Sequence, residues 1–399
     1  MAKIDKLIKA KKVINDEFYT QYADIQKEIN AYLEFNPDTF RNKVVLLPCD
    51  DPEWSNFTRF FAQNFDNLGL KKLISTSYAY NSKNKEFRGP YQLTFFEEDN
   101  PKYSKEKSMK KGKIFILEKD VNNSDSIDID DLEWDYLDED GDFRSDEVTK
   151  LRDEADIIIT NPPFSLLIPF VEWIFEGKKD FLIIANYGAI TYKNIFPLIK
   201  DNKLWLGSGF HAGNAFFKIP SEACSQYDSS VYDEKTGLVK FRNCCWFTNL
   251  DHGRRHTELE LMTMEENIKY SKHKEIRNKG YVKYDNYDAI EVNYYDAIPK
   301  DYDGIMGVSS SFFNNFCPEQ FEIVACSQTG CHPDEMVLKN YKDYIGYKQS
   351  GLKTGRTGNT CGNNPMIEQN DGVHDYYMNA DGKMVQSTNG RIFIRLKKQ

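Results

Sequence analysis

The chain has 399 residues, of which 40% are hydrophobic and 14% aromatic, a composition that supports a sizeable core and excludes a chain disordered throughout. No apolar run approaches the roughly 20 residues that a membrane-spanning helix needs, and the lysine-rich start lacks the apolar core of a signal peptide, so we expect a cytoplasmic protein. Taken over the whole chain, the formal net charge of −10 argues against a nucleic-acid-binding protein.

Apolar runs and helical spacing predict an alternating pattern of elements over the first 250 residues. Apolar residues at helical spacing predict a helix over 21–33, and Asp51 before Pro52 predicts a second helix that Asp51 caps. Further helices are predicted over 165–175 and ending near Lys200. Short apolar runs predict buried strands at 43–48, 71–79, 113–118, 156–160, 180–186, 204–206, 214–219 and 241–248. Such alternation indicates an α/β fold, with a mostly parallel sheet and helices on both faces.

The pattern changes at about residue 251, after which Tyr, Asn, Asp, Gly and Lys dominate. We expect two domains, residues 1–251 and 252–399, the second made of mixed strands and long loops with a mobile segment at 351–364. The eight cysteines form no CxxC pair, and the spacing of Cys326, Cys331 and His332 matches no common zinc site. We therefore expect reduced thiols and no metal.

Charge is distributed unevenly between these parts. Residues 118–154 hold 16 Asp or Glu and 4 Lys or Arg, and we expect most of this acidic run to be a solvated loop. The rest of the chain is therefore slightly positive. Residues 269–283 hold six Lys or Arg and one Glu, and residues 391–398 hold four basic residues and no acid. This distribution allows a polyanion to bind one part of the chain.

The tetrapeptide Asn161-Pro162-Pro163-Phe164 directly follows the predicted strand 156–160. Adjacent prolines alone arise about once by chance in a chain this long, but the flanking Asn and Phe make the full motif far rarer. The Asn161 side-chain oxygen and a carbonyl of the rigid turn can each accept one N–H of a planar amine, and Phe164 can stack on the ring that carries it. Ligands of α/β sheets bind beyond the carboxyl ends of strands. The motif therefore predicts a site for methylating an exocyclic amine, with S-adenosylmethionine as a donor that needs no strong base.

Several segments, in order, resemble the EcoRI-type adenine-specific DNA methyltransferases. The segments are 16–20, 48–57, 141–145, 161–164 and 298–307. The resemblance covers most of the chain, from about residue 13 to residue 395. It implies a Rossmann-like methyltransferase sheet, S-adenosylmethionine as the methyl donor and N6-methyladenine in double-stranded DNA as the product, made on an adenine flipped out of the duplex.

The same resemblance implies individual site residues. The family's catalytic motif matches Asn161, Pro162, Pro163 and Phe164. Its cofactor-binding motifs match Tyr19, Thr20, Pro48, Cys49, Asp50, Asp142 and Phe143. Two features depart from methyltransferases in general: the loop after the first strand has no GxG, and the second strand ends in Ser75-Thr76-Ser77, without the acid that usually holds the ribose hydroxyls.

Basic residues of the second domain are candidate phosphate contacts, which as a group could form an electropositive face. They are Arg254, Arg255, Lys269, Lys272, Lys353, Arg356, Arg391 and Arg395. We expect a monomeric enzyme whose C-terminal target-recognition module binds double-stranded DNA, with any cognate restriction endonuclease acting separately on the same site. Two alternatives stay open: a methyltransferase acting on an RNA base or a protein glutamine amide, and a catalytically inactive DNA-binding protein, suggested by the missing glycines.

Overall fold

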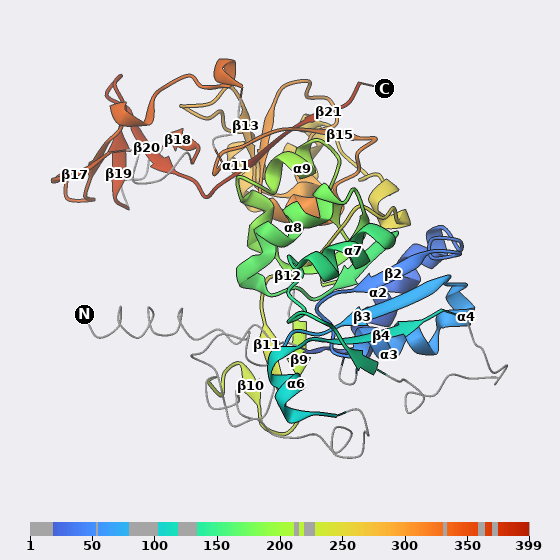
Figure 1. Ribbon diagram of the computed structural model, residues 1–399. Coiled ribbons are helices and arrows are strands. Elements are labelled where there is room, and N and C mark those ends of the chain that lie inside the picture. The colour runs from blue at the N-terminus through green and yellow to red at the C-terminus, as the bar shows by residue number, and fades with distance from the viewer. Residues whose placement is uncertain are drawn as a thin grey trace. The chain divides into compact units, whose positions relative to one another are not determined.

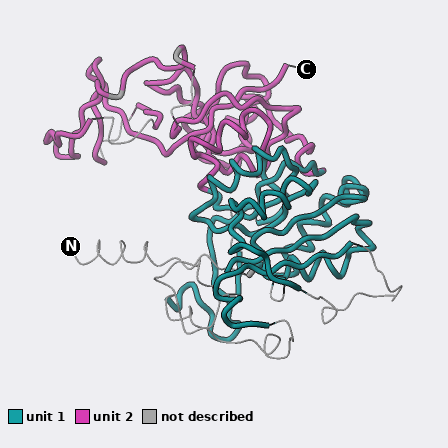
Figure 2. Tube along the Cα trace, viewed as in Figure 1, with its two compact units in different colours: residues 1–187, 205–252 teal, residues 188–204, 253–399 magenta. Residues whose placement is uncertain are grey.

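The computed structural model (Figure 1) describes residues 19–52, 55–79, 103–118, 134–210, 215–218, 228–329, 333–357, 364–368 and 374–398. The chain divides into two compact units (Figure 2): unit 1 comprises residues 1–187 and 205–252, and unit 2 comprises residues 188–204 and 253–399. This division differs from the expected boundary at residue 251 by the segment 188–204, which belongs to unit 2, and by residue 252, which belongs to unit 1. The functions expected of the two domains stay predictions.

Unit 1 is built around an eight-stranded sheet. In spatial order its strands are β5 (Trp134–Tyr136), β4 (Lys113–Leu117), β3 (Lys72–Thr76), β2 (Val44–Leu47), β6 (Ile157–Thr160), β7 (Asp180–Asn186), β12 (Cys244–Thr248) and β8 (Trp205–Leu206). The central strands β3, β2, β6 and β7 pair in parallel, whereas β4 and β12 are antiparallel to both of their neighbours. The prediction of an α/β fold with a large, mostly parallel sheet is confirmed.

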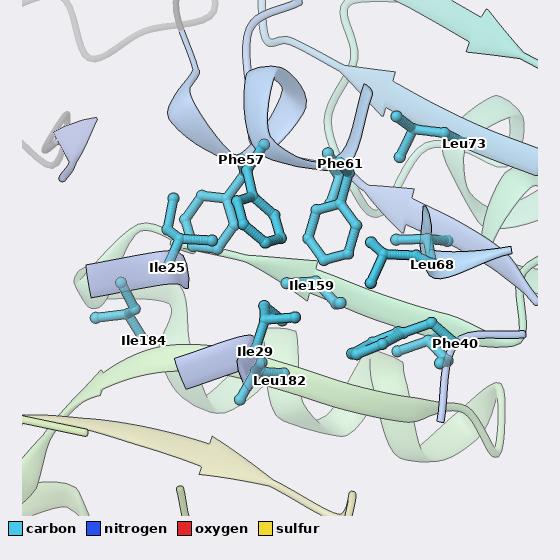
Figure 3. Packing of buried hydrophobic residues seen from close by; sticks show 14 of the residues in the cluster. Ile25, Ile29, Phe40, Phe57, Phe61, Leu68, Leu73, Ile159, Leu182 and Ile184 are labelled. Carbon is cyan, nitrogen blue, oxygen red and sulfur yellow. The ribbon is translucent and has the colours of Figure 1, made fainter. Parts of the chain in front are cut away.

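Helices pack on this sheet because its strands are apolar on both faces. In the part of unit 1 that the structure describes, the α-helices are α2 (Tyr22–Phe35), α3 (Asn56–Gln63), α4 (Phe65–Leu68), α6 (Lys105–Lys110), α7 (Asp146–Glu154) and α8 (Leu167–Glu176). Figure 3 shows one cluster in which Ile29 of α2 and Phe61 of α3 pack with Ile159 of β6. The intervening strand residues, such as Ile158 and Ile183, are also buried, and α7 and α8 contact β2 and β7. Burial on both faces is typical of parallel strands.

Two local predictions, the cap of one helix and the sheet of one strand, were wrong. Ser55, and not Asp51, caps α3, because its side chain accepts the N–H of Phe57. The acidic run 118–154, most of which was expected to be a solvated loop, contains β5 and α7, while its residues 119–133 lie outside the described ranges, so that expectation stays a prediction. The predicted strand at 214–219 exists as β9 (Ala215–Lys218) but lies outside the main sheet. It belongs to an antiparallel sheet with the order β1 (Tyr19–Thr20), β9, β11 (Leu238–Phe241) and β10 (Tyr232–Asp233).

Unit 2 contains two smaller sheets and short helices. Its helices are α9 (Phe196–Lys200), α10 (Met264–Tyr270) and α11 (Lys274–Lys279). One sheet has the order β13 (Ile290–Val292), β14 (Met306–Val308), β21 (Ile392–Leu396) and β15 (Phe321–Cys326). The other has the order β17 (Lys353–Thr357), β16 (Ile345–Tyr347), β19 (Tyr376–Met378), β20 (Met384–Ser387) and β18 (Met366–Glu368). The segment expected to be mobile therefore contains β17. Among the residues described in the two units, no helix combines the length and apolarity needed to cross a membrane.

Candidate active site

Asp50 joins the loop after β2 to the end of β6. Its two carboxylate oxygens accept hydrogen bonds from the hydroxyls of Ser55 and Thr160, each at 2.6 Å, and the residue is only 5% exposed. Burial raises the pKa of Asp50 to about 7, although the hydrogen bonds from Ser55 and Thr160 favour its ionised form. Because Thr160 immediately precedes Asn161, this contact connects the expected cofactor loop to the expected catalytic turn.

Hydroxyl groups at the end of β3 hold the same loop. Ser75 Oγ donates to the carbonyl of Asp50 at 2.5 Å, and Thr76 Oγ1 donates to the carbonyl of Pro48 at 3.2 Å. The backbone N–H of Asp50 donates to the carbonyl of Thr76 at 3.0 Å. Ser75 and Thr76 stand at the end of the second strand, where many methyltransferases have an acid. Here their hydroxyl groups fix the backbone of the glycine-free loop after β2. Within it, burial and the neighbouring carboxylate of Asp50 raise the pKa of the Cys49 thiol above its usual range.

An acid from a distant part of the sequence lies beside the end of β3. The Tyr78 hydroxyl donates to Asp142 Oδ2 at 3.0 Å, and Arg144 donates through Nε and Nη2 to the same carboxylate at 2.9 and 2.6 Å. Burial opposes ionisation, but these hydrogen bonds keep the pKa of Asp142 below its usual value. The strand β3 itself ends without an acidic residue. Asp142 therefore supplies an ionised carboxylate beside the end of that strand.

Phe143, the other residue of this expected motif, has its ring in the protein core. The ring centroid lies 4.9 Å from that of Phe170 and 5.6 Å from that of Trp173, both on α8. The side chain is buried. Phe143 therefore attaches the loop that carries Asp142 to the helix that follows the candidate catalytic turn.

The turn Asn161–Phe164 follows β6, as predicted. Pro162 is buried, and the other three residues are half-buried. The N–H of Leu166 donates to the carbonyl of Pro163 at 2.9 Å, within the 3₁₀ helix η4 (Phe164–Leu166) that leads into α8. The Phe164 ring packs against the apolar cluster of the sheet. The turn thus lies at the carboxyl edge of the parallel strands, where ligands of such sheets bind.

Thr20 offers a polar group suited to a ligand. The residue is 3% exposed, and its Oγ1 has no hydrogen-bond partner among the residues that the structure describes. Its carbonyl accepts from Asn56 Nδ2 of α3 at 2.7 Å, and β1 pairs Thr20 with Phe217 of β9 and Tyr19 with Lys218. An unsatisfied buried hydroxyl costs about 1–3 kcal/mol, so a polar atom of a bound ligand would stabilise this site.

Glu28 of α2 was not among the residues predicted to contribute to the site. It is completely buried, and its carboxylate accepts from the Tyr32 hydroxyl at 2.8 Å and from the backbone N–H groups of Ser208 and Gly209 at 2.8 and 2.5 Å. A Cβ atom at Gly207 would lie 2.2 Å from Glu28 Oε1. Glu28 therefore fixes the loop after β8, which continues from the pairing of β8 with β12 towards the carboxyl edge of the sheet.

Two of the expected phosphate contacts are buried in unit 2. Arg391 is 7% exposed, and its Nη2 lies 2.6 Å from Glu291 Oε1 while its Nε lies 3.1 Å from both Glu291 oxygens. Arg255 is also buried and donates to Asn202. In this structure neither guanidinium is presented to solvent, where a phosphate would be bound.

The other six expected contacts are exposed or half-buried. Lys272 forms an ion pair with Asp296 at 2.7 Å. Arg395 forms one with Glu322 at 2.7 Å. The Lys269 amine lies 5.0 Å from the centroid of a tyrosine ring. The remaining members of the group are Arg254, Lys353 and Arg356. The role of the whole group in DNA binding stays a prediction.

Comparisons with known proteins cover nearly the whole chain. The family model described as "Adenine-specific methyltransferase EcoRI" matches residues 6–397. The type II methyltransferase M.EcoRI of Escherichia coli is 42% identical over 320 residues, which cover 80% of this chain and 88% of that protein. M.MgeORF184P of Mycoplasma genitalium is 34% identical over 80% of this chain and 85% of its own length. M.MpnI of Mycoplasma pneumoniae is 34% identical over 80% of this chain and 84% of its own length. No solved structure matches.

Proposed function

The chain belongs to the family of EcoRI-type adenine-specific methyltransferases, and we propose that it transfers a methyl group from S-adenosylmethionine to the N6 amine of an adenine in double-stranded DNA. In this proposal the sheet of unit 1 is a Rossmann-like methyltransferase sheet and unit 2 carries target recognition. The observation that carries the proposal is the turn at Asn161, placed at the carboxyl edge of the sheet and tied through Thr160 to Asp50.

The turn supplies the groups that this reaction needs. The Asn161 side-chain oxygen and the Pro162 carbonyl would each accept one N–H of the adenine amine, so that the nitrogen lone pair is directed at the methyl group. Phe164 would stack on the adenine ring after the base has left the duplex. S-adenosylmethionine, when bound, supplies a methyl group on a sulfonium leaving group, so the amine can lose its proton to solvent without a strong base.

The residues present fit this cofactor. The buried Thr20 hydroxyl lacks a partner among the described residues. The loop after β2, which contains Pro48, Cys49 and Asp50, is held by hydroxyl groups at the end of β3. The ionised carboxylate of Asp142 lies at the end of β3. We infer that these groups hold the cofactor, with Asp142 as an acid beside the strand end where a ribose is usually bound.

The substrate is tested with a labelled methyl donor. The protein is incubated with the donor and duplex DNA, RNA or a protein mixture, and each polymer is then digested to identify the modified species. We expect N6-methyladenine from duplex DNA. Label recovered only from an RNA base or a glutamine amide would replace the proposal by the corresponding alternative. Absence of cofactor binding in calorimetry, with duplex binding retained, would favour the catalytically inactive DNA-binding protein.

The turn is tested with two variants. Asn161→Ala removes a group that holds the amine as it acquires charge, so we expect the single-turnover rate to fall by about 10²–10³ while cofactor binding stays near wild type. Phe164→Ala should weaken base capture, since stacking contributes about 1–3 kcal/mol per base, and Phe164→Tyr is the matched control that keeps an aromatic face. Capture is followed by the fluorescence of 2-aminopurine at the target position. A full rate in Asn161→Ala would contradict this assignment of the active site.

The type II names of the relatives support a role in a restriction-modification system. We propose that the enzyme acts as a monomer in the cytoplasm, and that a restriction endonuclease of the same target sequence is a separate protein. Sedimentation of the enzyme on a short duplex tests the first point. Protection of methylated DNA from the endonuclease tests the second.

A further inference from the structure

Strands β16 and β17 form a β-hairpin, the ribbon 345–357, in which β17 is the edge of the five-stranded sheet of unit 2 and β16 also pairs with β19 on its other side. The N–H of Lys348 donates to the carbonyl of Leu352 at 2.8 Å, and that of Gly351 donates to the carbonyl of Lys348 at 2.8 Å, so the turn between the strands is closed. The Leu352 side chain at this turn is 67% exposed. The ribbon 345–357 therefore presents an apolar tip to solvent.

The ribbon 345–357 carries positive charge and no acidic residue of its own. It contains Lys348, Lys353 and Arg356 and no Asp or Glu, and all three cations are exposed. None of them forms an ion pair with a residue in the described ranges. Asp375 on the neighbouring segment is engaged by the backbone N–H of Gln349 at 3.2 Å. Some exposed lysines elsewhere in unit 2 are paired, as Lys283 with Asp288 at 3.0 Å and Lys383 with Glu368 at 3.5 Å, whereas others, such as Lys274 and Lys342, are exposed without an ion pair to a described residue.

The cations lie on both faces of the ribbon 345–357. A Cβ atom at Gly346 would lie 2.7 Å from Thr354 Oγ1 and 3.2 Å from Arg356 Cβ, so Arg356 shares the face of Gly346. Successive strand residues point to opposite faces, which puts Tyr347 on the other face. Lys353 is the register partner of Tyr347.

We propose that the ribbon 345–357 enters a groove of the DNA duplex, with Lys353 and Arg356 contacting phosphates on opposite walls and Leu352 against the base edges. The major groove admits a two-stranded ribbon, and both of its walls are lined by phosphates. Cations on both faces and an apolar tip match that geometry and charge. The inference rests on the proposed function, because it assigns the recognition of the same DNA substrate to one element of unit 2.

The experiment compares two double variants of the full chain. Lys353→Gln with Arg356→Gln removes the unpaired cations, and Lys283→Gln with Lys383→Gln removes two paired lysines of the same unit as a matched control. Binding of a fluorescent duplex is measured by anisotropy over a range of salt concentrations, with S-adenosylhomocysteine present. We expect the ribbon variant to bind at least about tenfold more weakly and its salt slope to fall by about 2, because two phosphate contacts are lost. The control should stay near wild type.

Leu352→Ser tests the tip, with Leu338→Ser as the control because Leu338 is also exposed, at 52%. Leu352→Ser should weaken duplex binding without changing the salt slope, since no charge is removed. Equal affinities and slopes for the two double variants, with melting temperatures like wild type, would overturn the inference and leave the cations as protection of an edge strand. Failure of the wild-type protein to bind or methylate duplex DNA would instead overturn the proposed function. If the wild-type protein methylates duplex DNA and the ribbon variant binds the duplex as tightly as wild type, only the ribbon inference is wrong.

Discussion

The Thr160 hydroxyl donates to Asp50 Oδ2 at 2.6 Å, across 110 residues of sequence and with both side chains buried. Thr160 is the last residue of β6, and Asp50 lies in the loop after the neighbouring parallel strand β2. The hydrogen bond therefore fixes the start of the Asn161 turn relative to a loop that we expect to hold the cofactor. Positioning of this kind affects the rate of a group transfer more than it affects binding.

Thr160→Val keeps the shape of the side chain but removes the donor to Asp50. We expect the single-turnover methylation rate to fall about tenfold or more, because the Asn161 turn is no longer held, and the free energy of unfolding to fall by about 1–3 kcal/mol. The rate is measured with saturating cofactor and duplex, and stability by urea unfolding.

Thr248→Val is the matched control for this variant. Thr248 is also completely buried in the same sheet, where its hydroxyl donates to the carbonyl of Phe181 at 2.7 Å. It lies at the opposite end of β7 from the site, so its loss should reduce stability to a similar extent and leave the rate of the folded enzyme unchanged. If the two variants lose the same fraction of their rate, the contact between Thr160 and Asp50 has no positioning role.

Glu28→Gln replaces one carboxylate oxygen with an NH₂ group where the backbone N–H groups of Ser208 and Gly209 need acceptors. A buried charge-assisted hydrogen bond is lost and a donor then faces a donor, so we expect a loss of about 2 kcal/mol in the free energy of unfolding. Urea unfolding followed by tryptophan fluorescence measures it. Glu34→Gln, on the exposed side of the same helix, should change stability by less than about 0.5 kcal/mol. A Glu28→Gln protein as stable as wild type would show that the loop after β8 is held by other contacts.

Arg391→Ala should act on folding and not on DNA contact. It leaves the Glu291 carboxylate, which is only 15% exposed, without the guanidinium that lies 2.6 Å away, so we expect the free energy of unfolding to fall by about 3 kcal/mol. Arg395→Ala removes an exposed ion pair with Glu322, which should cost less than about 1 kcal/mol. Thermal unfolding distinguishes the two, and equal small shifts would mean that the buried pair adds no stability.

The core strands were predictable because each is a short apolar run buried on both faces, and this pattern is local. The four-residue strand β9 was assigned to the wrong sheet although its pattern differs: Ala215 and Phe217 are buried while Phe216 and Lys218 are exposed. Such alternation is typical of a strand with one solvated face. The helix cap was wrong because Asp51 and Ser55 are both good capping residues within one turn, and residue preference alone does not choose between them.

The site was predictable only as far as its motifs are contiguous. The turn at Asn161 is visible in four adjacent residues, whereas the approach of Asp142 to Tyr78 depends on how β3, β4 and β5 pair. Glu28 did carry a signal, because it lies beside Ile29 on the apolar stripe of α2 that faces the core. A carboxylate on such a stripe needs buried donors, but the sequence does not show that backbone N–H groups some 180 residues away provide them.

Asp50 gives a pH-dependent prediction for cofactor binding. Burial raises the pKa of Asp50 to about 7, and a positive charge nearby favours the ionised form of a carboxyl group. If the sulfonium of S-adenosylmethionine binds beside Asp50, binding releases a proton when the pH is below about 7. The affinity for S-adenosylmethionine should therefore rise from pH 6 to pH 8, by up to about tenfold per pH unit below the pKa.

S-adenosylhomocysteine is the control ligand, since it carries the same amino and carboxylate groups but no sulfonium charge. Calorimetry at pH 6 and pH 8, in buffers with different ionisation enthalpies, measures both the ratio of the two affinities and the number of protons released. The ratio should favour S-adenosylmethionine more strongly at pH 8, and Asp50→Asn should abolish this change because the amide does not titrate. A ratio that stays constant across this range in the wild-type protein would place the sulfonium away from Asp50. The carboxylate would then serve only to hold Ser55 and Thr160 in place.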